Sequence, residues 1–234
     1  MKKLLIIVFL PFLIIKPVFS SHIIFLVHGY ANPNLILLRI NIKLRQNNFT
    51  TINYQYPGLF VDLERLGESL YYDVKNTQTD TVSFVTHSMG ALVLRSMMKF
   101  AASDFTFPVI HRIVMITPPN RGADIADFLG FTFLKPFLGP NVIKMKTDTL
   151  SYANKLPIPI NTEIGVIIGQ RGDGKGYNPL IKGDNDGLIR PENKLLGNEK
   201  DVLTVQHNHF TVLIVDDVLN SIINFLKYGK FNPY

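Results

Sequence analysis

One serine in the chain stands where a nucleophile could be activated. Ser88 follows a continuous apolar run at residues 81–86, and a helical pattern begins directly after it. A serine in a tight turn between a strand and a helix is exposed and reactive, provided that the residues two before and two after it are small. Gly90 meets this requirement, whereas Thr86 stands where glycine or alanine is commonest. The alternative is that a serine beside a glycine merely ends a strand.

Two backbone N–H groups could hold the negative charge that such a nucleophile creates. Ile23–Leu26 is a predicted strand that ends in Val27-His28-Gly29-Tyr30. One oxyanion N–H is expected from the loop after an early strand and the other from the residue after the nucleophile, which gives Tyr30 and Met89. We expect His28 to orient this loop through its side chain. A His-Gly pair after a strand is equally typical of a plain turn.

A carboxylate to orient a general base is available in the segment 183–189. Asp186 is the preferred candidate, with Asp184 beside it and Asp173 nearer the preceding strand. Such a carboxylate fixes the tautomer of a histidine and stabilises its protonated form. The segment could also be an Asp/Asn/Gly turn or a loose cation loop, although the spaced acidic ligands of a calcium loop do not follow it.

Two histidines follow the last predicted strand and are candidates for the base. His207 and His209 precede an amphipathic helix, and the residues alone leave the choice between them open. A metal site is the less favoured alternative, because no third histidine or carboxylate stands at a recognisable spacing. The chemical groups thus occur in the order Ser, Asp, His, each after a predicted strand. This order differs from those of the two common serine-protease folds.

Six apolar runs must position these groups. They are nearly continuous in Ile, Val, Leu and Phe, which is typical of parallel strands buried on both faces. We therefore expect an α/β fold with a mostly parallel central sheet and helices on both faces. The runs are His22–His28, Thr51–Tyr56, Thr81–Thr86, Ile110–Thr117, Glu163–Gly169 and Val202–Gln206.

The segments between these runs are predicted to be mainly helical. Residues 215–226 carry an apolar stripe at helical spacing, and Gly229 marks the end of the helix. Met89–Ala102 is apolar nearly all round, so a buried helix is expected. Leu38–Arg45 alternates like a strand, but parallel neighbours need a crossover there, so we predict a helix with Asn32-Pro33 at its start. Phe128–Leu156 could equally be a hydrophobic lid or an ordinary crossover.

The N-terminus has the pattern of a secretory signal. Lys2 and Lys3 precede an apolar run from Leu4 to Ile15, and Val18-Phe19-Ser20 predicts cleavage before Ser21. The run is shorter than the roughly 20 residues that span a bilayer. We expect residues 1–20 to be removed and residues 21–234 to form one secreted or periplasmic domain; an uncleaved membrane anchor is the alternative.

Charge and cysteine content exclude several classes of function. Without Lys2, Lys3 and Lys16, 21 basic residues face 18 acidic ones, a net charge of +3. The basic residues form no stripe with interleaved aromatics, so nucleic-acid binding has no support. The chain contains no cysteine, which excludes disulfides, a cysteine nucleophile and thiolate metal sites.

Taken together, the motifs resemble the α/β-hydrolase superfamily, and within it a compact group of bacterial lipase- and esterase-like proteins. The resemblance covers nearly all of residues 21–234, and Thr86 is familiar in this group. It rests on Leu26-Val27-His28-Gly29, Phe84-Val85-Thr86-His87-Ser88-Met89-Gly90, Ile116-Thr117-Pro118-Pro119-Asn120-Arg121-Gly122, Asn185-Asp186-Gly187-Leu188 and Asn208-His209-Phe210.

The resemblance implies a serine hydrolase of carboxylic esters that needs no cofactor. In similar proteins the Asn-Asp-Gly segment carries the catalytic acid and the histidine before the last helix is the base, which gives Asp186 and His209. The implied partner is a small-molecule or lipid ester, with membrane-surface contact as a further option. Two alternatives are an acyltransferase with the same triad and a non-catalytic, membrane-tethered binding protein.

Overall fold

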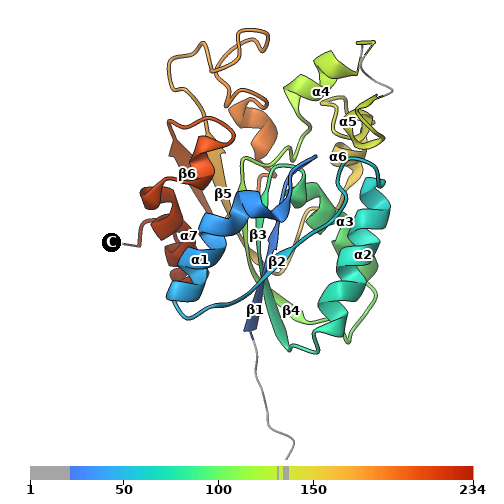
Figure 1. The fold of residues 1–234 in the computed structure, drawn as a ribbon, viewed down its shortest axis with the longest axis vertical. Helices are drawn as coiled ribbons and strands as arrows, with labels where there is room; N and C mark the ends of the chain where they lie inside the picture. The colour runs from blue at the N-terminus through green and yellow to red at the C-terminus, as the bar shows by residue number, and fades with distance from the viewer. Residues whose placement is uncertain (1–21, 131, 134–136, 234) are drawn as a thin grey trace, which may run out of the picture.

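The computed structural model describes residues 22–130, 132–133 and 137–233, and its centre is a six-stranded sheet. All pairings in this sheet are parallel, in the order β2-β1-β3-β4-β5-β6 (Figure 1). The predicted parallel sheet is therefore confirmed. Its strands are β1 (His22–Val27), β2 (Thr50–Tyr54), β3 (Thr81–His87), β4 (Val109–Ile116), β5 (Glu163–Gly169) and β6 (Asp201–Val205).

Helices cover both faces of the sheet, as the apolar runs predict. Ile24 and Leu26 of β1 face α1 (Leu38–Gln46) and α7 (Asp216–Tyr228). The alternate residues Phe25 and Val27 face α2 (Leu63–Asn76) and α3 (Gly90–Ala101). Because successive side chains of a strand point to opposite faces, a central strand must be apolar at every position to bury both.

The predicted helices 38–45, 89–102 and 215–226 all exist. Leu38–Gln46 is helical although apolar and polar residues alternate in its sequence. The helix buries only Ile40 and Leu44, which lie on the same face one turn apart, so the other apolar residues of the alternation are not part of the core. The expected start at Asn32-Pro33 is wrong in detail. Pro33 is extended and precedes a 3₁₀ turn, η1 (Asn34–Leu37), while the Asn32 side chain donates to Tyr30 O instead. Gly229 ends α7 in the left-handed region at φ 71°.

Among the described residues between β4 and β5, the structure has three short helices in place of one crossover helix. They are α4 (Asp124–Leu129), α5 (Asn141–Lys144) and α6 (Tyr152–Lys155). Figure 1 shows α4 and α5 beyond the carboxyl ends of the strands, above α3. We call residues 123–130, 132–133 and 137–145, which include α4 and α5, the cap over this edge of the sheet.

The predicted signal segment, residues 1–20, lies outside the described residues. Among the helices that the structure does describe, none combines the length and the apolar character that crossing a bilayer requires.

Candidate active site

Ser88 occupies a strained turn between β3 and α3. Its φ is 51°, in the left-handed region that residues other than glycine rarely adopt. Its backbone N–H donates to Ile116 O at 3.0 Å, and its carbonyl accepts from Ala91 N at 3.0 Å, so both neighbouring elements hold the turn. Strain of this kind costs on the order of 1–3 kcal/mol and is concentrated at functional sites. The side chain is partly exposed.

The turn can form because Gly90 lets α3 approach the end of β1. A Cβ atom on Gly90 would lie 2.2 Å from Val27 O and 2.6 Å from His28 O. The residue two positions after the serine must therefore be small because the backbone of the β1 end lies directly against it. Thr86 is accommodated two positions before it, where its buried hydroxyl donates to Val114 O at 3.5 Å.

The loop after β1 is fixed by the buried side chain of His28. Its Nδ1 donates to Gly29 O at 2.9 Å and its Nε2 accepts from Tyr56 N at 3.3 Å, which assigns the neutral tautomer. The ring stacks on Tyr56 with centroids 4.0 Å apart. Burial lowers the pKa of His28, in keeping with this neutral form. The histidine holds the loop, as the sequence predicts.

This loop and the turn after β3 each have a backbone N–H group next to the serine. The N–H groups of Tyr30 and Met89 donate to no other described residue. A Cβ atom on Gly29 would lie 3.0 Å from Ser88 Cβ, so the loop and the turn are in direct contact. The Tyr30 hydroxyl donates to Leu138 O in the segment before α5, which ties the loop to the cap.

Asp186 and His209 meet at the same edge of the sheet. His209 Nδ1 donates to Asp186 Oδ2 at 2.9 Å, and His209 N donates to Asp186 O at 2.8 Å. The exposed fractions of the two residues are 1% and 2%. The other carboxylate oxygen accepts the backbone N–H groups of Leu188 and Ile189, both at 2.9 Å. The histidine is thereby held with Nδ1 on the acid and Nε2 available.

Asp186 remains ionised in spite of its burial. Burial alone raises the pKa of a carboxyl group. At Asp186 this effect is outweighed by the neighbouring His209, by the Lys194 ammonium and by the backbone donors, which bring the pKa of Asp186 to about 2. Ser88 Oγ and the His209 ring form no hydrogen bond in the part of the chain that the structure describes. Such catalytic contacts commonly tighten only around a substrate.

The alternative acids and the alternative base have different surroundings. Asp184 accepts backbone N–H groups of Arg171 and Gly172 at 3.0 and 2.8 Å, and thereby fixes the loop after β5. Asp173 accepts from the backbone of the residues that follow it and pairs with Arg171 at 2.9 Å. The carboxylate of Asp186 bonds to His209, not to His207.

Two further residues are buried beside this pair: His87, which the sequence indicates to be structural, and Lys194, which the sequence did not reveal. His87 Nε2 donates to His209 O at 3.0 Å, and burial together with His209 holds the pKa of His87 at about 3, so its ring is neutral. Lys194, in η3 (Pro191–Lys194), is fully buried and places its Nζ 3.2 Å from Asp186 Oδ2. No motif marks Lys194; only the tertiary contact identifies it.

Ser88 opens into a small apolar pocket under the cap. The pocket has a volume of about 70 Å³, and Tyr30 lines it together with residues of the cap and of the loop after Asp186. Hydrophobic side chains next to a nucleophile suit an apolar acyl group. The remaining lining residues are Pro119, Ala123, Ile125, Ala126, Leu129, Val142, Met145, Leu188 and Ile189.

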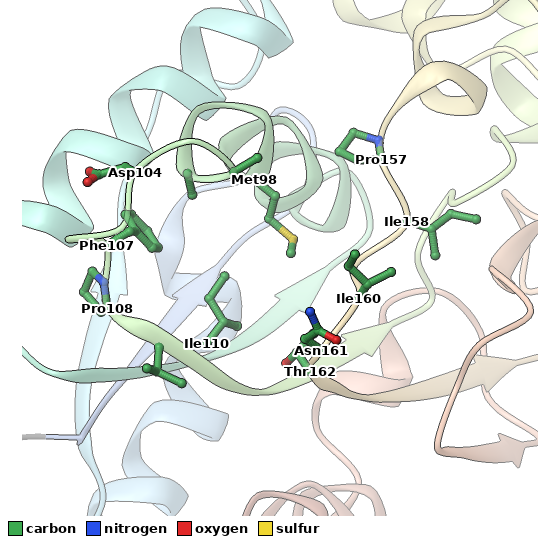
Figure 2. Close-up of a pocket in the computed structure, with 13 residues that line it drawn as sticks. Met98, Asp104, Phe107, Pro108, Ile110, Pro157, Ile158, Ile160, Asn161 and Thr162 are labelled. Carbon is green, nitrogen blue, oxygen red and sulfur yellow. The ribbon is translucent and has the colours of Figure 1, made fainter.

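A larger hollow of about 470 Å³ lies elsewhere, between the end of α3, the start of β4 and the segment before β5 (Figure 2). Most of its lining is apolar, including Phe107, Ile110 and Ile160. Its one charged lining residue, Asp104, pairs with Lys75 at 2.6 Å. None of the described residues that line this hollow pairs a nucleophile with a base.

The sequence matches no protein-family model, and no curated protein matches it. Solved structures do match. The mature form of Bacillus licheniformis lipase BlEst2 superposes with a TM-score of 0.70 at 16% identity, over 90% of this chain and 93% of that one. The product of gene lin2722 from Listeria innocua superposes with a TM-score of 0.62 at 16% identity. The match covers 89% of this chain and 94% of that one. The metagenomic carboxyl esterase MGS0156 superposes with a TM-score of 0.55 at 15% identity. The match covers 83% of this chain and 66% of that one. At these identities the likeness shows the fold.

Gly90→Ala is expected to destabilise the protein strongly. The new methyl group would meet backbone oxygen atoms of Val27 and His28, which cannot move without displacing β1. We expect a loss of about 3 kcal/mol or more, measured by thermal or urea unfolding. Gly130→Ala is the milder control, because φ at Gly130 is −63° and the nearest described atom to its Cβ would be Ala126 O at 3.1 Å, a tight contact but 0.9 Å longer than the one of 2.2 Å at Gly90. Equal stability of the two variants would contradict this account of the turn.

Proposed function

We propose that this chain, which has the α/β-hydrolase fold, is a serine hydrolase that cleaves carboxylic esters. The observation that carries the proposal is the buried hydrogen bond of 2.9 Å between His209 Nδ1 and Asp186 Oδ2, at the edge of the sheet where Ser88 stands in its strained turn. A nucleophile, a base and an acid that orients the base are the groups that acyl transfer needs.

The reaction would proceed through an acyl-enzyme. His209 Nε2 takes the proton of Ser88 Oγ as the hydroxyl attacks the ester carbonyl, and the N–H groups of Tyr30 and Met89 hold the oxyanion. The imidazolium gives its proton to the leaving alcohol as the ester C–O bond breaks. Water, activated by the same histidine, then hydrolyses the acyl-enzyme. Asp186 remains ionised throughout and stabilises the imidazolium. No cofactor takes part in this scheme.

The pocket supports an apolar acyl group as the part of the substrate next to Ser88. The cap over it is tied to two neighbouring loops: Arg190 Nε donates to Asp124 Oδ1 at 2.6 Å, and Asn141 Nδ2 donates to Gly58 O at 3.0 Å. A pocket held in this way is preformed. Its small volume favours short acyl chains over long ones.

Contact with a lipid surface and export are parts of the same proposal. Phe60 and Phe137, on neighbouring segments of the cap region, are each 77% exposed, as suits residues that insert into a lipid interface.

The N-terminal pattern of two lysines followed by an apolar run supports cleavage before Ser21 and a secreted or periplasmic mature enzyme.

Ser88→Ala tests the proposed function. We expect hydrolysis of nitrophenyl esters, assayed from acetate to palmitate, to fall by a factor on the order of 10⁶ in kcat, as when other nucleophiles of this kind are removed. The fold should survive, because the hydroxyl contributes no hydrogen bond to the described structure, and circular dichroism checks this. Turnover like that of the wild type in the folded variant would refute the proposal.

The acid and the base are tested by ranking variants on one soluble ester. His209→Ala should fall to the level of Ser88→Ala, whereas His207→Ala should keep most of its activity. Asp186→Asn should lose about 10⁴ in rate, because an amide favours the wrong imidazole tautomer.

Asp184→Asn and Asp173→Asn are the matched controls: Asp184 holds backbone N–H groups, Asp173 holds backbone N–H groups and pairs with Arg171, and neither carboxylate bonds to a histidine in the described structure. The reverse ranking of the histidines would transfer the role of base to His207. If Asp173→Asn were instead the inactive variant, the acid would lie nearer the end of β5.

A further inference from the structure

A fully buried lysine contacts the acid of the proposed triad. Lys194 Nζ donates to Ile189 O at 2.6 Å and lies 3.2 Å from Asp186 Oδ2, the oxygen that also accepts His209 Nδ1. Neither side chain of the Lys194–Asp186 pair has any exposed surface. Burying an ammonium group costs several kcal/mol, and an apolar side chain of similar length would fill the same space without that cost. Packing alone therefore does not explain a lysine here.

The charge balance of the buried site gives the lysine a role. When His209 is neutral, Asp186 would be a single buried negative charge. The imidazolium balances that charge only while a proton is held during the reaction. In the described part of the chain, Asp186 forms ion pairs with His209 and Lys194 alone. Within the described residues, Lys194 is thus the ion-pair partner of this carboxylate that does not depend on the proton held by His209.

The other acidic groups near Lys194 are paired elsewhere. Asp124 bonds to Arg190 Nε at 2.6 Å and to Asn193 Nδ2 at 3.0 Å, and Glu192 pairs with Arg190 at 2.9 Å. Burial lowers the pKa of Lys194, while the adjacent carboxylate of Asp186 opposes that shift. Asp186 is therefore the anion that compensates the buried ammonium.

The histidine ring that contacts His209 from the sheet carries no charge. His87, at the end of β3, has its ring centroid 4.9 Å from that of His209, and its pKa of about 3 keeps it neutral. His28, at the end of β1, is buried and its pKa is lowered as well. In the part of the chain that the structure describes, Asp186 and Lys194 form the charged pair against which an imidazolium at His209 must form.

The segment that carries Lys194 is itself fixed to the end of β4. Asn120 Nδ2 donates to Lys194 O at 2.8 Å, and Arg121 N donates to Asn193 O at 2.8 Å. The Asn120 carbonyl in turn accepts from the buried Arg95 of α3 at 2.9 Å. The Pro-Pro-Asn-Arg-Gly motif, to which the sequence assigns no chemistry, thereby anchors the lysine.

From this geometry we infer that Lys194 is a positioning residue of the Ser88–His209–Asp186 site, which acts through the carboxylate of Asp186. The inference rests on the proposed function. The ammonium keeps Asp186 in the place where it accepts His209 Nδ1, and its positive charge opposes protonation of the imidazole.

Lys194→Met removes the charge and keeps a side chain of similar length. We expect kcat/KM at its plateau to fall about tenfold or more, a part of the roughly 10⁴-fold lost when the orienting acid is removed. The acid limb of the pH profile of kcat/KM, which reports protonation of the base, should move up by about one pH unit because a like charge is gone. Lys182→Met, an exposed lysine of the same loop, is the matched control and should leave both unchanged.

A double-variant cycle tests whether Lys194 acts through Asp186. In the Asp186→Asn background, Lys194→Met should cause no further loss of kcat/KM, because the two residues act as a unit. An acid limb at the wild-type position in Lys194→Met would overturn the inference. So would a full additional loss in the double variant.

Thermal unfolding keeps the inference testable without activity. Removing one partner of a buried ion pair is strongly destabilising, whereas replacing both with neutral groups is not. The double variant Asp186→Asn/Lys194→Met should therefore melt above Asp186→Asn alone, even if Lys194→Met alone does not fold. A double variant that melts below Asp186→Asn contradicts the pairing. The melting comparison is independent of the activity test on Ser88→Ala. If Ser88→Ala kept its turnover, the proposed function would be refuted, but the ion pair between Lys194 and Asp186 would not.

Discussion

The contact between the first residue of α3 and the last carbonyls of β1 sets the geometry of the whole site. A side chain at Gly90 would lie 2.2 Å from Val27 O, so the helix can begin here only with glycine. This close approach holds Ser88 at φ 51°, and it sets the loop after β1 directly against the serine. Because all six strands are parallel, the loops after β1, β3, β4, β5 and β6 meet at one edge of the sheet. The groups for the proposed chemistry come from these loops, which agrees with the position of ligand sites in open α/β sheets.

A second constraint is the charge buried beside that turn. Asp186 is ionised, almost fully inaccessible, and held by His209, Lys194 and two backbone N–H groups. Such a carboxylate is costly unless every lone pair is used, and here the surrounding donors use them. The same donors fix its position, so rigidity and charge compensation come from one set of contacts. The rigidity extends to the cap, since Asp124 and Asn141 tie it to two neighbouring loops.

The sheet and the position of Ser88 were predictable from the sequence, because both depend on local patterns. Continuous apolar runs identify strands buried on two faces, and a strand, a serine and a glycine in close succession identify the turn. Leu38–Gln46 shows where periodicity fails: the segment alternates, yet it forms a helix because a parallel crossover requires one. The short helices α4, α5 and α6 were not predicted individually, since six or fewer residues give no helical period.

The partners of the site were less predictable, since they depend on contacts between distant parts of the chain. The choice of His209 over His207 rested on resemblance, and it is the bond to Asp186, 23 residues away, that distinguishes the two in space. The burial of Lys194 was not predictable, because a lysine in a polar segment is ordinarily exposed. Nothing in Pro191–Lys194 signals that its last side chain turns inward to a carboxylate.

The central claim is that the His209–Asp186 pair activates Ser88. Labelling with a fluorophosphonate probe, followed by peptide mass mapping, measures this most directly, because the probe reacts with an activated serine and needs no knowledge of the substrate. The account predicts a single label at Ser88 in the wild-type protein and a rate of labelling that collapses in His209→Ala. A folded protein that remains unlabelled, or a label at Ser88 that forms at the wild-type rate without His209, would contradict it.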